Sequence, residues 1–128
     1  MSFTHTIAKN WKGAGREILS SKKYTGNAQQ SISESVPDSS SDFFVAFSCD
    51  VSEIKSIFIL SAVDMTLETN DGATPIDTIN LKAGIPYIWH TDSYFTNLLG
   101  TDVTALYLTT GSVGAGTFQL EVITDPTP

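Results

Sequence analysis

The sequence predicts an all-β protein: a two-sheet antiparallel sandwich, most compatible with a jelly roll, with eight or nine strands. Apolar residues occupy every second position of the run Thr117–Ile123, where they alternate with Gln119 and Glu121. Short runs of this kind recur along the chain with turn chemistry between them, and no stretch has the length and period of an ordinary helix. At 128 residues, the chain is expected to form a single domain, 1–128, with its own core.

The N-terminal third predicts strands with thin apolar faces. Apolar residues and His5 alternate with threonines in Ser2–Ala8, which indicates a short strand or an extended arm. Asn10–Arg16 mixes an aromatic residue, cations and two glycines without a period, and this predicts a loop. Two further strands are predicted over Ile18–Tyr24 and Gln29–Val36.

The middle of the chain predicts the core strands. Pro37–Asp42 is a loop signal, and Asp42–Cys49 is apolar on both faces, as in a buried strand. Ile54–Val63 is the most hydrophobic run; its pattern also allows a helix, but the neighbouring strands favour β structure. Met65–Thr69 alternates and leads into Asn70-Asp71-Gly72, a hairpin-type turn.

The second half continues the same pattern. Strands are predicted over Ile76–Leu81, Tyr87–His90 and Val103–Leu108, and the last of these is apolar on both faces, as expected between two layers. Pro86 removes a backbone donor, so it should lie at a strand start or on an edge. The segment Thr91–Gly100 is predicted to be a longer loop.

Charge is distributed unevenly along the chain. The net charge of −7 argues against nucleic acid as a partner, because phosphate binding needs a basic field. Residues 1–17 are compatible with an extended basic arm, and such asymmetry can orient a protein on an acidic partner or on a copy of itself. A solvated edge strand protected by lysines is the alternative. Five of the seven basic residues precede residue 24: Lys9, Lys12, Arg16, Lys22 and Lys23.

Cysteine and targeting signals indicate a protein made in the cytoplasm. One cysteine, Cys49, excludes an internal disulfide and fits a reducing compartment; its apolar surroundings predict a buried, inert thiol. The N-terminus lacks the apolar core of a signal peptide, and no run approaches a membrane span. No membrane partner is expected.

No catalytic, metal or cofactor site is predicted. The two histidines, His5 and His90, have no metal-ligand spacing to each other. His90, Asp92 and Ser93 include the residue types of a hydrolytic triad, but adjacent positions on a strand point to opposite faces. We therefore expect a protein that is not an enzyme.

Two segments are candidate contact surfaces. The loop 91–100 carries four large apolar residues that either pack over the end of the sandwich or form an oligomer contact: Tyr94, Phe95, Leu98 and Leu99. The N-terminal arm combines an aromatic residue with cations, the usual anchors of interfaces, although Trp11 capping the core is an alternative. The arm's contact candidates are Lys9, Trp11, Lys12 and Arg16.

Four segments resemble a class of short proteins encoded among the head genes of tailed bacteriophages: Asp64–Asn70, Asp77–Trp89, Tyr94–Leu98 and Thr101–Thr104. Some proteins of this class are capsid cement, or decoration, proteins, which are small β-sandwich or jelly-roll modules that sit as trimers over junctions between hexamers of the shell. The likeness covers the second half of the chain well and the first half loosely. Its motifs are structural, and no family binding residue can be transferred to this sequence.

The resemblance implies a structural virion protein on the capsid exterior, made in the host cytoplasm. Its partners would be the major capsid protein and itself, as a homotrimer, and the arm would contact the capsid. The alternative is a carbohydrate- or receptor-binding sandwich of a phage tail appendage, in which exposed aromatic rings stack on sugars. The aromatic residues for that role would be Trp11, Trp89 and Tyr94.

Overall fold

A computed structural model of the chain describes residues 2–126 and confirms the all-β class. The one short helical element in this range is a 3-10 turn, Val51–Glu53, capped by Asp50, whose side chain accepts a hydrogen bond from the backbone N–H of Ser52. The strands are β1 (Phe3–Gly13), β2 (Arg16–Gly26), β3 (Ala28–Val36), β4 (Phe43–Val45), β5 (Ile54–Ser61), β6 (Met65–Thr69), β7 (Thr78–Leu81), β8 (Tyr87–His90), β9 (Leu106–Thr109) and β10 (Gly116–Thr124).

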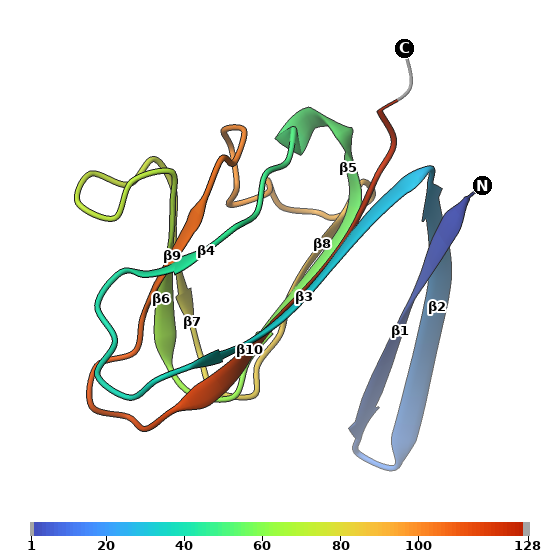
Figure 1. Cartoon of the computed structure of the whole chain (residues 1–128). Coiled ribbons are helices and arrows are strands. Elements are labelled where there is room, and N and C mark those ends of the chain that lie inside the picture. Colours follow the sequence, from blue (N-terminus) through green and yellow to red (C-terminus); the bar gives the residue numbers. More distant parts are fainter. Residues whose placement is uncertain (1, 127–128) are drawn as a thin grey trace.

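Eight of these strands form the sandwich (Figure 1), in two four-stranded sheets ordered β3-β10-β5-β8 and β4-β9-β6-β7. All neighbouring strands are antiparallel. The pairs β3–β10, β4–β9, β5–β8 and β6–β7 are nested, as in a long hairpin wound around the core, and this is the topology of a jelly roll. The remaining pair, β1–β2, is a separate two-stranded ribbon.

The core lies between the two sheets. On β5, Ile57 and Ile59 are fully buried, and they meet Leu67 of β6 and Leu108 of β9 from the opposite sheet within one apolar cluster. The inward face of β10 contributes Leu120 and its neighbours at every second position, as the alternation predicted. Burial of this apolar surface is the main driving force for folding.

The N-terminal residues differ from the prediction. Asn10–Arg16 is not a loop: β1 continues to Gly13, β2 begins at Arg16, and a two-residue turn joins them. Both turn residues have positive φ, +50° at Ala14 and +75° at Gly15, which matches the twist that antiparallel strands require of a short hairpin. The predicted basic arm is therefore one half of a β-hairpin.

Other strands begin later or end earlier than predicted: β9 begins at Leu106 and not at Val103, and β7 begins at Thr78 and not at Ile76. β4 ends at Val45, although Cys49 still forms an isolated antiparallel bridge with Val103 and remains buried. Asn70 adopts a positive φ of 71°, but β6 and β7 are joined by a longer loop than a tight hairpin turn. In that loop, the Thr69 backbone N–H donates to the carbonyl of Asp77, 3.0 Å away.

Candidate functional site

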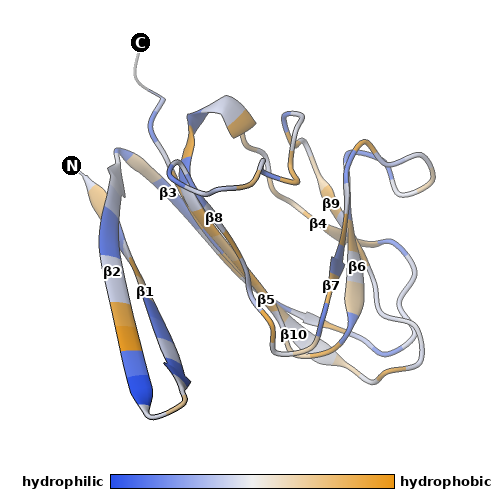
Figure 2. Ribbon diagram, turned by 180° about the vertical axis from the view of Figure 1, so that it is seen from behind, coloured by the Kyte–Doolittle hydropathy of each residue, from blue (hydrophilic) through white to orange (hydrophobic). Residues whose placement is uncertain are grey.

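The hairpin β1–β2 projects from the sandwich and is the most exposed element of the fold (Figures 1 and 2). Only Asn27 separates the end of β2 from the start of β3, so the ribbon leaves directly from an edge strand of the sheet. Each of its strands has 11 residues, about 36 Å at the usual rise per residue. Tyr24 and Gly26 are buried at its base, whereas every residue from Ala8 to Lys23 is exposed.

Three polar contacts fix the base of the hairpin. The Tyr24 ring stacks on His90 of β8 with centroids 4.7 Å apart, and the Tyr24 hydroxyl lies 2.9 Å from His90 Nδ1. Lys22 Nζ donates to Asp92 Oδ2 at 2.7 Å. On the other strand, His5 Nδ1 lies 3.2 Å from Ser56 Oγ. The ribbon is thus held by both strands and does not hang from a single covalent link.

The surroundings of the base lower the pKa of both histidines. Burial lowers the pKa of His90, and the charges of Lys9 and Lys22 lower it further against the opposing effect of Asp92. Burial also lowers the pKa of His5, although Glu121 acts in the opposite direction. These surroundings favour the uncharged form of both histidines.

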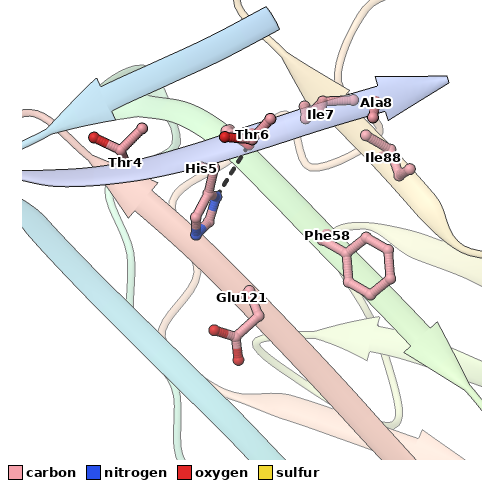
Figure 3. A pocket seen from close by; sticks show the side chains of 9 residues that line it. Thr4, His5, Thr6, Ile7, Ala8, Phe58, Ile88 and Glu121 are labelled. Atoms are coloured by element: carbon pink, nitrogen blue, oxygen red, sulfur yellow. Dashed lines mark hydrogen bonds between the residues drawn. The ribbon is translucent and has the colours of Figure 1, made fainter. Parts of the chain in front are cut away.

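A groove of about 360 Å³ lies between the hairpin and the outer face of the sheet (Figure 3). His5 points from β1 toward the sheet, and Glu121 of β10 and Phe58 of β5 form the opposite wall. Ile7 and Ile88 line it further along the ribbon. The groove shows that the hairpin stands off from the sheet beyond its base.

The distal half of the hairpin has one apolar face that the rest of residues 2–126 leaves uncovered. Cross-strand register places Trp11 opposite Ile18, on the face of the ribbon that carries Tyr24 nearer the base. Trp11 is 71% exposed and Ile18 51% exposed. On the other face, Lys12 pairs with Glu17 at 3.8 Å.

The predicted arm candidates Lys9, Trp11, Lys12 and Arg16 thus all lie in the exposed distal part of the hairpin. Trp11 does not cap the core.

The loop after β8 presents the second candidate surface. Tyr94 is fully exposed, and Phe95 and Leu98 are about half exposed at 53% and 52%. Leu99 is a correction: only 2% of it is exposed because it packs into the core cluster, so it is not a contact residue.

Hydrogen bonds hold this loop in place. The Tyr87 hydroxyl donates to Asn97 Oδ1 at 2.6 Å and accepts a hydrogen bond from the Leu98 backbone N–H at 2.9 Å. The Trp89 indole N–H donates to the Phe95 carbonyl at 2.9 Å. The exposed apolar side chains therefore sit on an ordered backbone, so presenting them to a partner costs little conformational entropy.

The structure does not bring the aromatic residues of a sugar-binding site together. Trp11 lies in the distal hairpin and Tyr94 in the loop after β8. Trp89 is half-buried, packs against the core and uses its indole N–H within the molecule. A stacking platform for sugars would need such rings exposed on one surface.

Sequence reasoning did not identify the residues that position the hairpin. Tyr24, His5 and His90 form its anchors, and Ile18 and Leu19 add apolar surface to its distal part. One signal was available: the chain has only two histidines, and both fall in predicted strands. Their pairing with a tyrosine and a serine depends on tertiary contacts that the sequence does not specify.

Within residues 2–126, no group of three or more His, Cys, Asp or Glu side chains is placed to hold a metal ion. No helix in this part of the chain is long and apolar enough to cross a membrane.

Comparison with known proteins gives no family. No family model matches the chain, and no curated protein matches it. Among solved structures, the chain is similar to a protein of Bacillus endospore appendages, a family of disulfide-linked pili, with a TM-score of 0.44. The two share 10% sequence identity, over 77% of this chain and 88% of that chain. A likeness at this level does not extend to function.

Proposed function

We propose that the chain is a structural virion protein that decorates a tailed-phage capsid as a homotrimer, bound to the major capsid protein on the outside of the shell. The observation that supports the proposal is the anchored hairpin, whose distal part exposes the apolar side chains of Trp11, Ile18 and Leu19 among cationic residues. The jelly-roll fold and the sequence resemblance described above support the same role. A protein of this kind acts through contacts and performs no chemistry.

Charge separation gives the hairpin a preferred type of surface. Residues 3–26 contain five cations and Glu17, a net charge of +4; subtracting this from the total of −7 leaves −11 for the rest of the chain. The basic hairpin projects from an acidic sandwich. Its positive charge attracts it to acidic protein surfaces and does not repel it from any of them. The contact on the shell would accordingly be acidic.

The face of the hairpin that carries Lys12 also carries Lys23 and Leu19, since these residues fall at alternating register positions. Leu19 is 70% exposed, which provides an apolar centre between the two cations. We assign this face to the shell. Binding of the protein stabilises the assembled shell by an amount that grows with affinity and occupancy. Linking three subunits in a trimer raises the effective concentration of each contact with the shell.

The test is co-sedimentation of the purified protein with shells of the tailed phage that encodes it. Wild-type protein is expected to sediment with the shells, and Lys12→Glu with Lys23→Glu is expected to release it while the thermal midpoint stays unchanged. Lys55→Glu with Lys82→Glu makes the same charge change on the sandwich and serves as the matched control. Absence of wild-type binding overturns the proposal, and release by the control pair overturns the assigned face.

The carbohydrate-binding alternative is tested in parallel with a glycan panel. Quenching or enhancement of tryptophan fluorescence by a glycan, together with no binding to shells, would replace the capsid role with that of a tail module.

A further inference from the structure

We infer that the distal hairpin of one copy docks on the loop after β8 of a second copy. The tip face is defined by Trp11 and Ile18 with Lys9 and Arg16; the loop patch is defined by Tyr94, Phe95 and Leu98. This inference rests on the proposed function, because it names how the proposed oligomer is held together. It leaves the opposite face of the hairpin, with Lys12 and Lys23, for the shell.

The tip face is built for protein contact. Trp11 and Ile18 are cross-strand neighbours, so their side chains form one continuous apolar surface. Arg16 lies on the same face, and tryptophan with arginine is the combination most enriched at the centres of interfaces. A ribbon anchored at its base presents these side chains with little loss of freedom on binding.

The hairpin cannot place this face on its own loop. The loop starts just after His90, which stacks on Tyr24 at the base of the ribbon. Trp11 and Ile18 lie six residues farther along the strands than His5 and Tyr24, about 20 Å toward the turn. Trp11 and Ile18 therefore lie at the far end of the hairpin from the loop patch, and a contact between these two residues and the patch requires two molecules.

The loop patch complements the tip face in polarity and charge. Its three exposed apolar side chains are followed by Asp102, whose carboxylate accepts a hydrogen bond from the Val51 backbone N–H at 3.0 Å. Asp50 directly precedes Val51 in the chain, so it lies at the same end of the sandwich as Asp102. Cations of the tip face meet acids at the rim of an apolar centre, which favours association and fixes its orientation.

In a homotrimer, a contact between two different surfaces of the same chain is heterologous, with each tip docked on the loop of the next copy. Each copy then offers one tip and one loop, so the assembly closes into a ring or continues as a filament, and a homotrimer is the ring with three contacts. A two-fold dimer built from one self-complementary patch would instead be lost in only one of the two variants described next.

The test mixes two variants, each lacking one of the two surfaces. Trp11→Ser with Ile18→Ser removes the tip face, and Tyr94→Ser with Leu98→Ser removes the loop patch; all four side chains are exposed, so the fold should be retained. Light scattering behind size exclusion should give assemblies for the wild type and monomers for each variant. An equal mixture should give a dimer of about twice 13.8 kDa and nothing larger, because one intact tip meets one intact loop. Val113→Ser, at another exposed apolar residue, should behave as the wild type.

Three results would overturn the inference: a wild type that stays monomeric up to about 1 mM, an assembly that persists in either variant, or a mixture that remains monomeric. Shell binding separates these failures from failure of the proposed function. Monomers that still sediment with shells overturn only the docking of copies. Assemblies that behave as expected but never bind shells overturn only the capsid role.

Discussion

Tyr24 stacks on His90 with ring centroids 4.7 Å apart, and this contact joins the projecting hairpin to the edge of the jelly roll. The Tyr24 hydroxyl reaches Nδ1 of the same histidine at 2.9 Å, so one residue pair supplies both an apolar and a polar contact. Lys22 and Asp92 add an ion pair one step along the strands. The direction of the hairpin therefore depends on a few identifiable side chains.

Removing the Tyr24 hydroxyl should loosen the hairpin and leave the sandwich intact. Tyr24→Phe deletes one hydrogen bond, worth about 0.5–1.5 kcal/mol, while the ring contact remains. Tyr24→Ala removes the buried ring and its contact with His90 as well, for a further loss of about 3–5 kcal/mol. Trypsin measures the effect, because five of the seven cleavable residues lie in the hairpin: Lys9, Lys12, Arg16, Lys22 and Lys23.

Cleavage in the hairpin should accelerate in the order wild type, Tyr24→Phe, Tyr24→Ala. Cleavage at Lys55 and Lys82 in the sandwich serves as the internal control and should change much less. Equal rates for all three proteins would show that the stacking contact does not anchor the hairpin.

Acidification should detach the base of the hairpin. The pKa values of His5 and His90 are lowered by burial, so the folded base binds fewer protons than the unfolded chain around the ordinary histidine pKa. Their contribution to stability is present above a pH of about 6.5 and is lost as the pH falls below it. Lys9 and Lys22 strengthen the effect at His90, and Asp92 opposes it.

Amide protection factors, which are corrected for intrinsic exchange, should fall in β1 and β2 between pH of about 7.5 and about 5 while those of β10 stay high. The variant His5→Gln with His90→Gln should show no such pH dependence. Protection that stays constant in the wild type over this range would contradict the assigned role of the histidines.

Local pattern predicted the sandwich strands and missed the hairpin turn for physical reasons. Met65–Thr69 and Tyr87–His90 coincide with β6 and β8 because alternation and flanking turn residues define both. At Ala14-Gly15 the turn requires two positive φ values, and alanine rarely adopts one, so the usual Asn-Gly or Asp-Gly signal is missing. In addition, both faces of the hairpin are exposed, so its sequence lacks the alternation of apolar and polar residues that burial of one face imposes.

The order of the strands lay beyond local pattern. β3 pairs with β10 across most of the chain, and such nested pairing is set by the core as a whole. The candidate contact residues were found from composition, since aromatic and cationic side chains without a period stand out in sequence. Composition did not predict which of these residues are buried and which are exposed. Leu98 and Leu99 are adjacent in one loop, yet Leu98 is about half exposed and Leu99 is buried in the core.

Cys49 should be unreactive in the folded protein. Burial raises the pKa of its thiol to about 11, and the charges of Asp50, Glu53 and Asp102 act in the same direction. Relative to the ordinary value of 9.0, the two-unit rise lowers the thiolate fraction near pH 8 by about 100-fold. A thiol-specific chromogenic reagent should therefore react at least about 100-fold more slowly with native protein than with protein in denaturant. Comparable rates would mean that the end of the sandwich around Cys49 opens readily.

Gly26, at the junction between the hairpin and the sandwich, should not tolerate a side chain. A Cβ at this position would lie 2.4 Å from the Thr124 carbonyl oxygen and 2.5 Å from Ile123 Cγ2. One of these atoms is backbone in β10, which cannot move without disturbing the sheet, so Gly26→Ala should destabilise the protein by about 1–3 kcal/mol. Gly100→Ala is the matched control, because its nearest neighbour, Asp77 Oδ1, would be 3.9 Å away.

The midpoint of thermal denaturation should fall by several degrees in Gly26→Ala and stay nearly unchanged in Gly100→Ala. Tryptic cleavage of the hairpin should rise in Gly26→Ala as well, because relief of the clash moves the base of β2 away from β10. Identical midpoints for the two variants would show that the hairpin is not packed against β10 as closely as these contacts require.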